Sequence, residues 1–188
     1  MTNWYTADPH FNHASIIKFC DRPFSDVSQM DQTILRNLEA CVGWDDDLYI
    51  VGDFSFGGES SRSYVQNCFN RIPGKKHLII GNHDTKATLS LGWTSVQIIA
   101  EIKDGEQSLV LCHYPMITFN GARRGALQIF GHVHGNWQGS RNAVNVGVDV
   151  WNFLPVRVGD IQRRAKMLLV NKHWLDVEPG RGRVEEER

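Results

Sequence analysis

Five short apolar runs in this chain each lead into a polar residue of a kind that binds metal ions. The runs cover residues 4–7, 48–51, 78–80, 109–112 and 127–130, and they lead into Asp8 and His10, Asp53, Asn82, His113, and His132 and His134. Short apolar runs bounded by Gly or Pro are typical of buried strands. Open α/β folds place their sites at the carboxyl ends of strands. We therefore expect these side chains to meet at one edge of a sheet.

Length and composition predict one globular domain. The chain has 188 residues and a formal net charge of −1, so a substantial core is expected and no strong field favours nucleic acid or an anionic membrane. No apolar stretch approaches the roughly 20 residues that cross a bilayer, and residues 1–5 lack the features of a signal peptide. The four cysteines form no CxxC pair, which is typical of a reducing compartment. We expect a cytoplasmic protein without membrane contact, with its domain over residues 1–180 and a frayed, charged tail over 181–188.

The spacing of apolar residues indicates helices between the early strands. Residues 24–42 contain a helix, for which Ser28 with Asp31 is the expected start signal and Gly43 the stop. We also expect a helix over 60–72, strands over 96–102, 107–112 and 144–150, and a helix or turn over 159–166. Residues 167–170 fit either a helix or a strand. This order predicts an α/β or a layered mixed-sheet fold.

The polar residues after the runs favour paired divalent transition metals. Imidazole and carboxylate donors without thiolates suit such ions. Asp53 follows Gly52, which allows a tight backbone path off its strand, and its carboxylate is the candidate for bridging two cations. Asp8 and His10 stand two residues apart, so they can project the same way from extended backbone. Two divalent ions, two carboxylates and a hydroxide leave about one positive charge, which attracts a phosphoryl anion.

The ordered motifs resemble those of the calcineurin-like metallophosphoesterase superfamily. They are Asp8-x-His10, Gly52-Asp53, Gly81-Asn82-His83-Asp84, His113 and Gly131-His132-x-His134. The stretch over residues 8–24 resembles a small bacterial and phage branch of that superfamily. The resemblance implies an α/β fold, a four-layer αββα sandwich of two mixed sheets flanked by helices, with a metal site at the carboxyl ends of the strands.

The resemblance also implies a role for each motif residue. One metal would be held by Asp8, His10, Asp53 and His134, and the other by Asp53, Asn82, His113 and His132. His83 would protonate the leaving-group oxygen or contact the phosphate, and Asp84 would orient His83. Manganese heads the candidate metals, and iron, nickel and zinc are also suited.

Several other residues are open between a binding role and a structural one. His13 could contact the bound phosphate or cap the next helix, and Arg22 could bind substrate or form a surface ion pair. The loop arginines could bind further phosphates or be solvated charges; they are Arg123, Arg124 and Arg141. Some aromatic residues near the motifs could stack on a base or pack around the site, namely Phe11, Phe54, Phe56 and Trp137.

The expected activity is hydrolysis of phosphodiesters by a hydroxide that two metal ions activate. Its partner would be a phosphate ester, with a nucleotide or a nucleic-acid end among the candidates. A chain of this length implies an open site, which favours diesters over monoesters. The alternatives are a phosphomonoesterase or phosphatase, and a non-catalytic scaffold on the same fold. The physiological substrate and the oligomeric state stay open.

Overall fold

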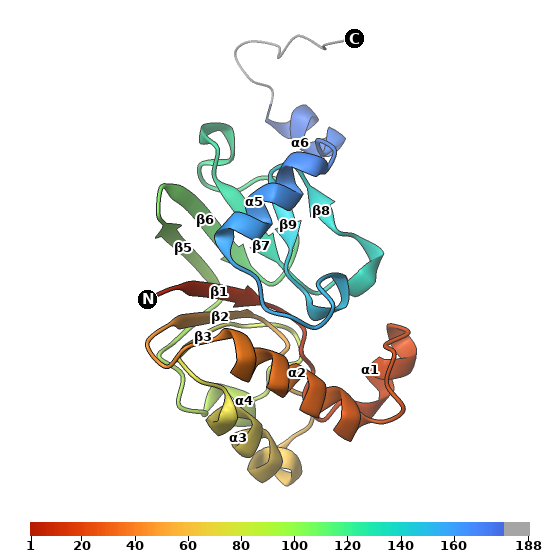
Figure 1. The fold of residues 1–188 in the computed structure, drawn as a ribbon. Helices are drawn as coiled ribbons and strands as arrows, with labels where there is room; N and C mark the ends of the chain where they lie inside the picture. Colours follow the sequence, from red (N-terminus) through yellow and green to blue (C-terminus); the bar gives the residue numbers. More distant parts are fainter. Residues whose placement is uncertain (179–188) are drawn as a thin grey trace.

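Two β-sheets form the centre of the molecule (Figure 1), whose computed structural model describes residues 1–178. The first sheet has the order β1-β2-β3-β4 and contains only parallel pairs. Its strands are Asn3–Thr6, Asp47–Val51, Lys75–Ile79 and Ser95–Gln97. The second sheet has the order β5-β6-β7-β9-β8 and mixes parallel with antiparallel pairs. Its strands, in chain order, are Ile99–Asp104, Gln107–Cys112, Leu127–Phe130, Gly139–Ser140 and Ala143–Asn145.

Helices flank this pair of sheets. In order from α1 to α6 they are Ala14–Phe19, Val27–Cys41, Arg62–Arg71, Lys86–Leu89, Val158–Met167 and Lys172–Val177. Figure 1 shows α2, α3 and α4 on the first sheet, and α5 packs against β9 and β1. The expected α/β sandwich is confirmed, although the first sheet is wholly parallel and not mixed. Its strands are linked by helices, and a helical crossover returns the chain in its original direction. The frayed tail and the domain end at residue 180 lie outside the described residues.

The first sheet is buried on both faces. Leu48, Ile50 and Leu78 pack with residues of α2 and α3, whereas Val51 and Ile79 pack with residues of the second sheet. Successive strand residues point to opposite faces, so each strand contributes to two core layers. This double burial explains why the sequence shows continuous apolar runs.

The expected helix over 24–42 is confirmed as α2, but it starts at a different signal. The Asp26 carboxylate accepts a hydrogen bond from the Gln29 N–H at 2.8 Å and caps the helix. Ser28 and Asp31 therefore do not mark the start. Asp31 is buried within α2, where its Oδ2 accepts a hydrogen bond from the Asn12 N–H at 2.9 Å. Several capping residues stand in this stretch, and the hydrogen bond that the Asp26 carboxylate accepts identifies the one that starts α2.

Two of the expected strands are divided in the structure. The run over 96–102 contributes to both sheets, because β4 and β5 are separated by Ile98 alone. The run over 144–150 contains the last two residues of β9 and then the 3₁₀-helix η4 (Val148–Val150). The segment over 159–166 is helical in α5, and residues 168–170 form neither helix nor strand. Apolar composition alone does not mark where a chain leaves one sheet.

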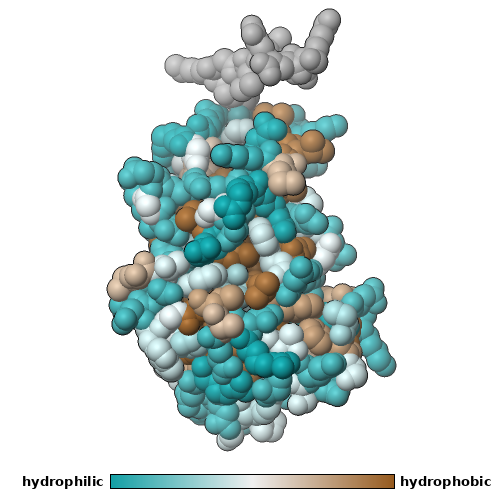
Figure 2. Space-filling view, in the orientation of Figure 1, coloured by the Kyte–Doolittle hydropathy of each residue, from teal (hydrophilic) through white to brown (hydrophobic). Residues whose placement is uncertain are grey.

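The surface carries no single dominant hydrophobic area on the face shown in Figure 2, where hydrophobic residues are scattered among hydrophilic ones. Exposed large apolar side chains come from separate elements, among them Phe19 of α1 and Trp44 before β2. Within residues 1–178, no helix combines the length and the hydrophobicity that spanning a bilayer requires.

Candidate metal centre

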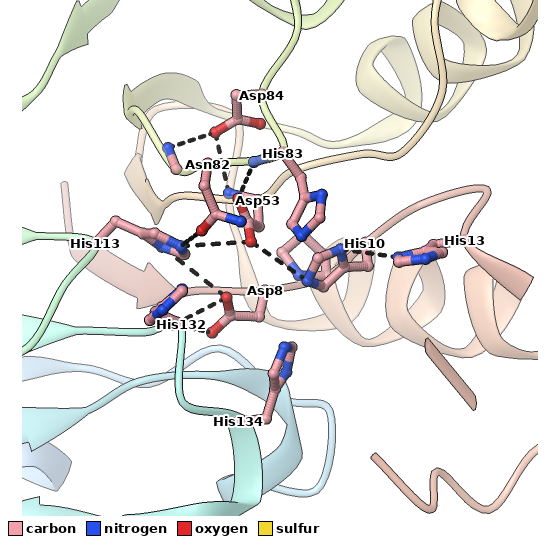
Figure 3. Close-up of polar contacts among 12 residues, drawn as sticks. Asp8, His10, His13, Asp53, Asn82, His83, Asp84, His113, His132 and His134 are labelled. Atoms are coloured by element: carbon pink, nitrogen blue, oxygen red, sulfur yellow. Dashed lines mark hydrogen bonds and ion pairs between the residues drawn. The ribbon is translucent and has the colours of Figure 1, made fainter. Parts of the chain in front are cut away.

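The ends of several strands bring the expected ligands into one cluster. The Ala7 N–H donates to Val146 O, and Ala7 O accepts from the Val148 N–H, which joins the end of β1 to the loop after β9. Because of this junction Asp8 lies between the two sheets, and its carboxylate accepts from the His132 N–H at 3.0 Å. Figure 3 shows that the structure gathers all seven expected residues, which are Asp8, His10, Asp53, Asn82, His113, His132 and His134.

Asp8, His10 and His134 form a first group of donors, with their ligand atoms within 4.8 Å of one another. Asp8 and His10 are fully buried, and within residues 1–178 the His10 Nε2 atom has no hydrogen-bond partner. A buried polar atom without a partner costs about 1–3 kcal/mol. A cation bound at His10 Nε2 would remove that cost, so these residues fit a metal ion.

Asp53, His113 and His132 form a second group with the same spacing. Asn82 adjoins this group, because its Oδ1 lies 3.2 Å from His113 Nε2. Asp53 Oδ2 lies 3.4 Å from His113 Nε2 and 3.5 Å from His10 Nε2. The Asp53 carboxylate therefore stands between the two groups, which is the position that a residue shared by two cations needs.

Five of the seven residues have a left-handed backbone conformation. The φ angles are 57° at Asp8, 53° at His10, 55° at Asp53, 69° at His132 and 50° at His134. Residues other than glycine rarely adopt this region, and each such residue costs on the order of 1–3 kcal/mol. Strain of this kind persists only where the surrounding structure enforces it, and it gathers at functional sites. The backbone conformation thus points to function independently of the residue types.

Glycines let the strand ends approach one another closely. A Cβ atom at Gly52 would lie 2.2 Å from His113 Nδ1, and one at Gly81 would lie 2.3 Å from Asp53 Oδ1. Gly52 also has a φ of 89°, which confirms the expected tight path off β2. The glycines before the ligands therefore provide space for a ligand from another strand as well as a turn.

Burial and neighbouring groups set the protonation of the metal-free cluster. Burial raises the pKa of Asp8 to about 6 and lowers the pKa of His10 to about 2. Burial also acts to raise the pKa of Asp53, but the contacts with His113 prevail and lower it to about 2. At neutral pH both carboxylates are therefore ionised and His10 is neutral, which is the state that a cation requires.

Metal binding should release protons to an extent that depends on pH. Burial opposes protonation of His134, yet its contact with Asp149 raises the pKa of His134 to about 10. His134 therefore carries a proton that a cation must displace at neutral pH, and Asp8 carries one below about pH 6. We expect release of roughly one proton near neutral pH, and an affinity that already falls as the pH drops through neutrality and falls more steeply below about 6, where Asp8 is also protonated. Calorimetric titration with manganese in two buffers of different ionisation enthalpy measures this, and equal heats in both buffers would contradict it.

The structure corrects both roles that the sequence left open for Arg22. Its side chain is buried, and its guanidinium donates to the two carboxylate oxygens of Asp149 at 2.8 and 2.9 Å. It also donates to Asp8 O at 2.8 Å. Arg22 therefore forms neither a surface ion pair nor a contact that a substrate could reach. It holds the backbone carbonyl of Asp8, one of the expected metal-binding residues, and the carboxylate of Asp149.

Asp149 is a residue of the site that the sequence did not indicate. Its Oδ2 lies 2.8 Å from His134 Nδ1, and this contact leaves His134 Nε2 for the cluster. Carboxylate partners of this kind orient metal-binding histidines. In the sequence, the only local sign of this role is that Asp149 is one acidic residue in the apolar run over 148–150. Its contact with Arg22 joins residues that lie 127 positions apart in the chain.

His83 points into the cluster (Figure 3), with its ring centroid 5.3 Å from that of His10. The backbone N–H of His83 donates a hydrogen bond to Asp53 Oδ1 at 2.8 Å. The structure corrects the role expected for Asp84, which within residues 1–178 makes no hydrogen bond to the His83 ring. The Asp84 carboxylate accepts hydrogen bonds of 2.8–3.0 Å from the backbone N–H groups of Gly81, Phe54 and Asp53. Asp84 therefore ties the ends of β2 and β3 together.

His13 precedes α1 but does not cap this helix through its side chain. Its Nδ1 lies 3.3 Å from His10 Nδ1, and its ring stacks on Phe56 with centroids 3.8 Å apart. His13 therefore occupies the N-cap position of α1 without a capping hydrogen bond from its side chain, and contact with a bound phosphate stays a prediction.

The three loop arginines lie away from the cluster. Arg123 and Arg124 belong to the 3₁₀-helix η2 (Ala122–Arg124), and the loop after it bonds to Gln107 at the start of β6. His113 follows the other end of β6, about 20 Å away along six strand residues. Arg141 precedes β9 beside the start of β7. All three arginines are exposed, and Arg123 forms an ion pair with Glu178.

Comparisons with known proteins support the fold and identify a related sequence. No family model matches the sequence. The uncharacterized protein MJ1445 of Methanocaldococcus jannaschii is 30% identical over 157 residues, which cover 80% of this chain and 83% of that protein. A protein of unknown function from Aquifex aeolicus, AQ665, has a crystal structure that matches with a TM-score of 0.71 and 24% identity, covering 87% of this chain and 98% of that chain. This match confirms the fold.

One further solved structure has a functional name. YfcE, a phosphoesterase from E. coli, matches with a TM-score of 0.46 and 16% identity, covering 85% of this chain and 83% of that chain. This similarity carries no conclusion about the activity of this chain.

Proposed function

The chain belongs to the same family as the uncharacterized protein MJ1445 of Methanocaldococcus jannaschii, and we propose that it is a metal-dependent phosphodiesterase. The observation that carries this proposal is the position of Asp53 between two groups of carboxylate and imidazole donors. Such donors suit manganese, iron, nickel and zinc, with manganese as the first candidate. The same residues form the motifs that resemble calcineurin-like metallophosphoesterases.

Two divalent ions would occupy the cluster. Asp8, His10, Asp53 and His134 would hold the first ion, and Asp53, Asn82, His113 and His132 would hold the second. When bound, such ions neutralise charge on phosphoryl oxygens and lower the pKa of a water molecule. The protein contributes fixed donor positions, since the buried Asp8, His10 and His113 have little freedom to move.

His83 would supply the proton that the leaving group needs. Its ring faces the cluster, while its backbone N–H is held by Asp53. Imidazole is suited to proton transfer near neutral pH. Asn82 is exposed, and His83 and His132 are half-buried, so the cluster is open on this side. An open site can accept a phosphate with two substituents, which favours diesters.

The remaining alternatives are a phosphomonoesterase or phosphatase, and a scaffold that binds a partner without catalysis. The buried His10 Nε2 that lacks a partner fits a bound cation, and turnover by the metal-loaded protein distinguishes an enzyme from a scaffold. We place the protein in the cytoplasm, because its four cysteines are unpaired, as is common in reducing compartments.

An activity screen tests the proposal. The metal-free protein is loaded separately with manganese, iron, nickel and zinc, and is assayed on bis(para-nitrophenyl) phosphate and para-nitrophenyl phosphate. We expect kcat/KM to be at least about tenfold higher for the diester, which corresponds to roughly 1.4 kcal/mol of transition-state stabilisation. A strong preference for the monoester would favour the phosphatase alternative. Metal binding without turnover of either ester would favour the scaffold.

A further inference from the structure

Phe56 presents an exposed aromatic ring next to the cluster. Its side chain is 41% exposed, whereas Phe11 and Phe54 are fully buried, and Trp137 is half-buried and stacks on Phe130. Packing therefore explains three of the four aromatic residues that the sequence singled out, and it leaves Phe56.

The ring of Phe56 is held rigidly on one side. The Phe56 N–H donates to Phe11 O at 2.9 Å, and Phe56 O accepts from Asn12 Nδ2 at 3.3 Å. The ring of His13 stacks on it with centroids 3.8 Å apart and an interplanar angle of 8°. His13 in turn contacts His10, so the ring of Phe56 is connected to the cluster through the rings of His13 and His10.

Phe56 also adjoins the proposed proton donor. Its ring centroid is 5.7 Å from that of His83, so both residues stand at the same part of the site. The exposed loop arginines stand at the other ends of their strands, and Arg22 is buried on Asp149. These four arginines are therefore not placed to recognise the substituent that leaves beside His83.

We propose that Phe56 is a stacking platform for the planar aromatic part of the leaving group, which is either a nucleoside that stacks through its base or an aryl alcohol that stacks through its ring. This inference rests on the proposed function, because it places the leaving group beside His83. Stacking on an exposed aromatic ring is worth roughly a factor of ten or more in binding. Phe56 therefore sets which diesters the protein prefers, and it takes no part in the bond breaking itself.

A leaving-group series tests the platform. Three methyl phosphodiesters carry para-nitrophenol, the 5′-hydroxyl of adenosine, or cyclohexylmethanol as the leaving group. For Phe56→Leu we expect kcat/KM to fall about tenfold or more for the two planar leaving groups and less than about twofold for the cyclic alkyl one. A loss with only one planar group would identify which source the platform accepts. Equal losses for all three would overturn the proposal.

Matched variants separate stacking from general damage. Phe56→Tyr keeps a planar ring and should retain the parent preference. Trp44→Leu removes a ring that is 78% exposed before the start of β2, at the end of the strand away from the cluster, and should change none of the three values. A change in Trp44→Leu as large as that in Phe56→Leu would count against a specific platform.

Binding measurements separate this inference from the proposed function. Manganese-loaded parent protein and Phe56→Leu are titrated calorimetrically with adenosine 5′-monophosphate and with ribose 5-phosphate. We expect the parent to bind the adenosine compound about tenfold more tightly and the variant to lose that difference. If no diester is hydrolysed but this difference disappears in the variant, the platform stands and the phosphodiesterase proposal fails. If diesters are hydrolysed and Phe56→Leu changes neither preference nor binding, the platform fails alone.

Discussion

Asp53→Asn will lose bound metal at both positions, and its turnover will fall to background. The Asp53 carboxylate lies within 3.5 Å of nitrogen atoms from both donor groups, so an amide removes the negative charge that the two cations share. Loss of an outer partner of a metal ligand already weakens metal binding about 10–100-fold. We therefore expect at least about a 100-fold weaker manganese affinity, measured by equilibrium binding and by mass spectrometry of the native protein.

Asp45→Asn is the matched control for this change. Asp45 is exposed before the start of β2, whereas Asp53 follows the end of the same strand. The control loses the same charge and should keep both ions and full turnover. Unaltered metal content in a folded Asp53→Asn protein would contradict the shared-ligand assignment. If the parent protein shows no turnover, and the parent and Asp53→Asn bind the same partner, the scaffold alternative is favoured.

His83→Ala will keep both ions and lose about 10²–10⁴-fold in kcat. The hydrogen bond from residue 83 to Asp53 Oδ1 comes from the backbone N–H, so the substitution retains it and the cluster should stay intact. The loss should be larger for an alkyl leaving group than for para-nitrophenol, because a poor leaving group depends more on a proton donor. Steady-state kinetics with both leaving groups, together with metal analysis, measures this.

The control for His83→Ala is His173→Ala, which removes an exposed imidazole from α6. It should leave kcat and the dependence on the leaving group unchanged. Loss of metal from His83→Ala would make His83 a ligand. An equal loss for good and poor leaving groups would argue against proton donation and for a contact with the phosphate.

Local patterns in the sequence predicted most of the elements of the fold. The helix α2 shows helical spacing of apolar residues, and the buried strands show continuous apolar runs, because both are set by which faces are buried. The division of the run over 96–102 between β4 and β5 was missed. It depends on pairing of β4 with β3 and of β5 with β6, and no single segment contains that information.

The sequence by itself predicted the candidate donor residues of the site, because five apolar runs each lead into one or two of them and the strand ends of one layered fold meet. Only the tertiary structure decided how those donors are held. Arg22 and Asp149 are 127 positions apart, yet they share two hydrogen bonds behind His134. Asp84 was expected to orient its neighbour His83, but it bonds to backbone N–H groups of two strand ends. Supporting contacts of this kind depend on distances between segments that folding brings together, and a linear spacing of residue types does not contain those distances.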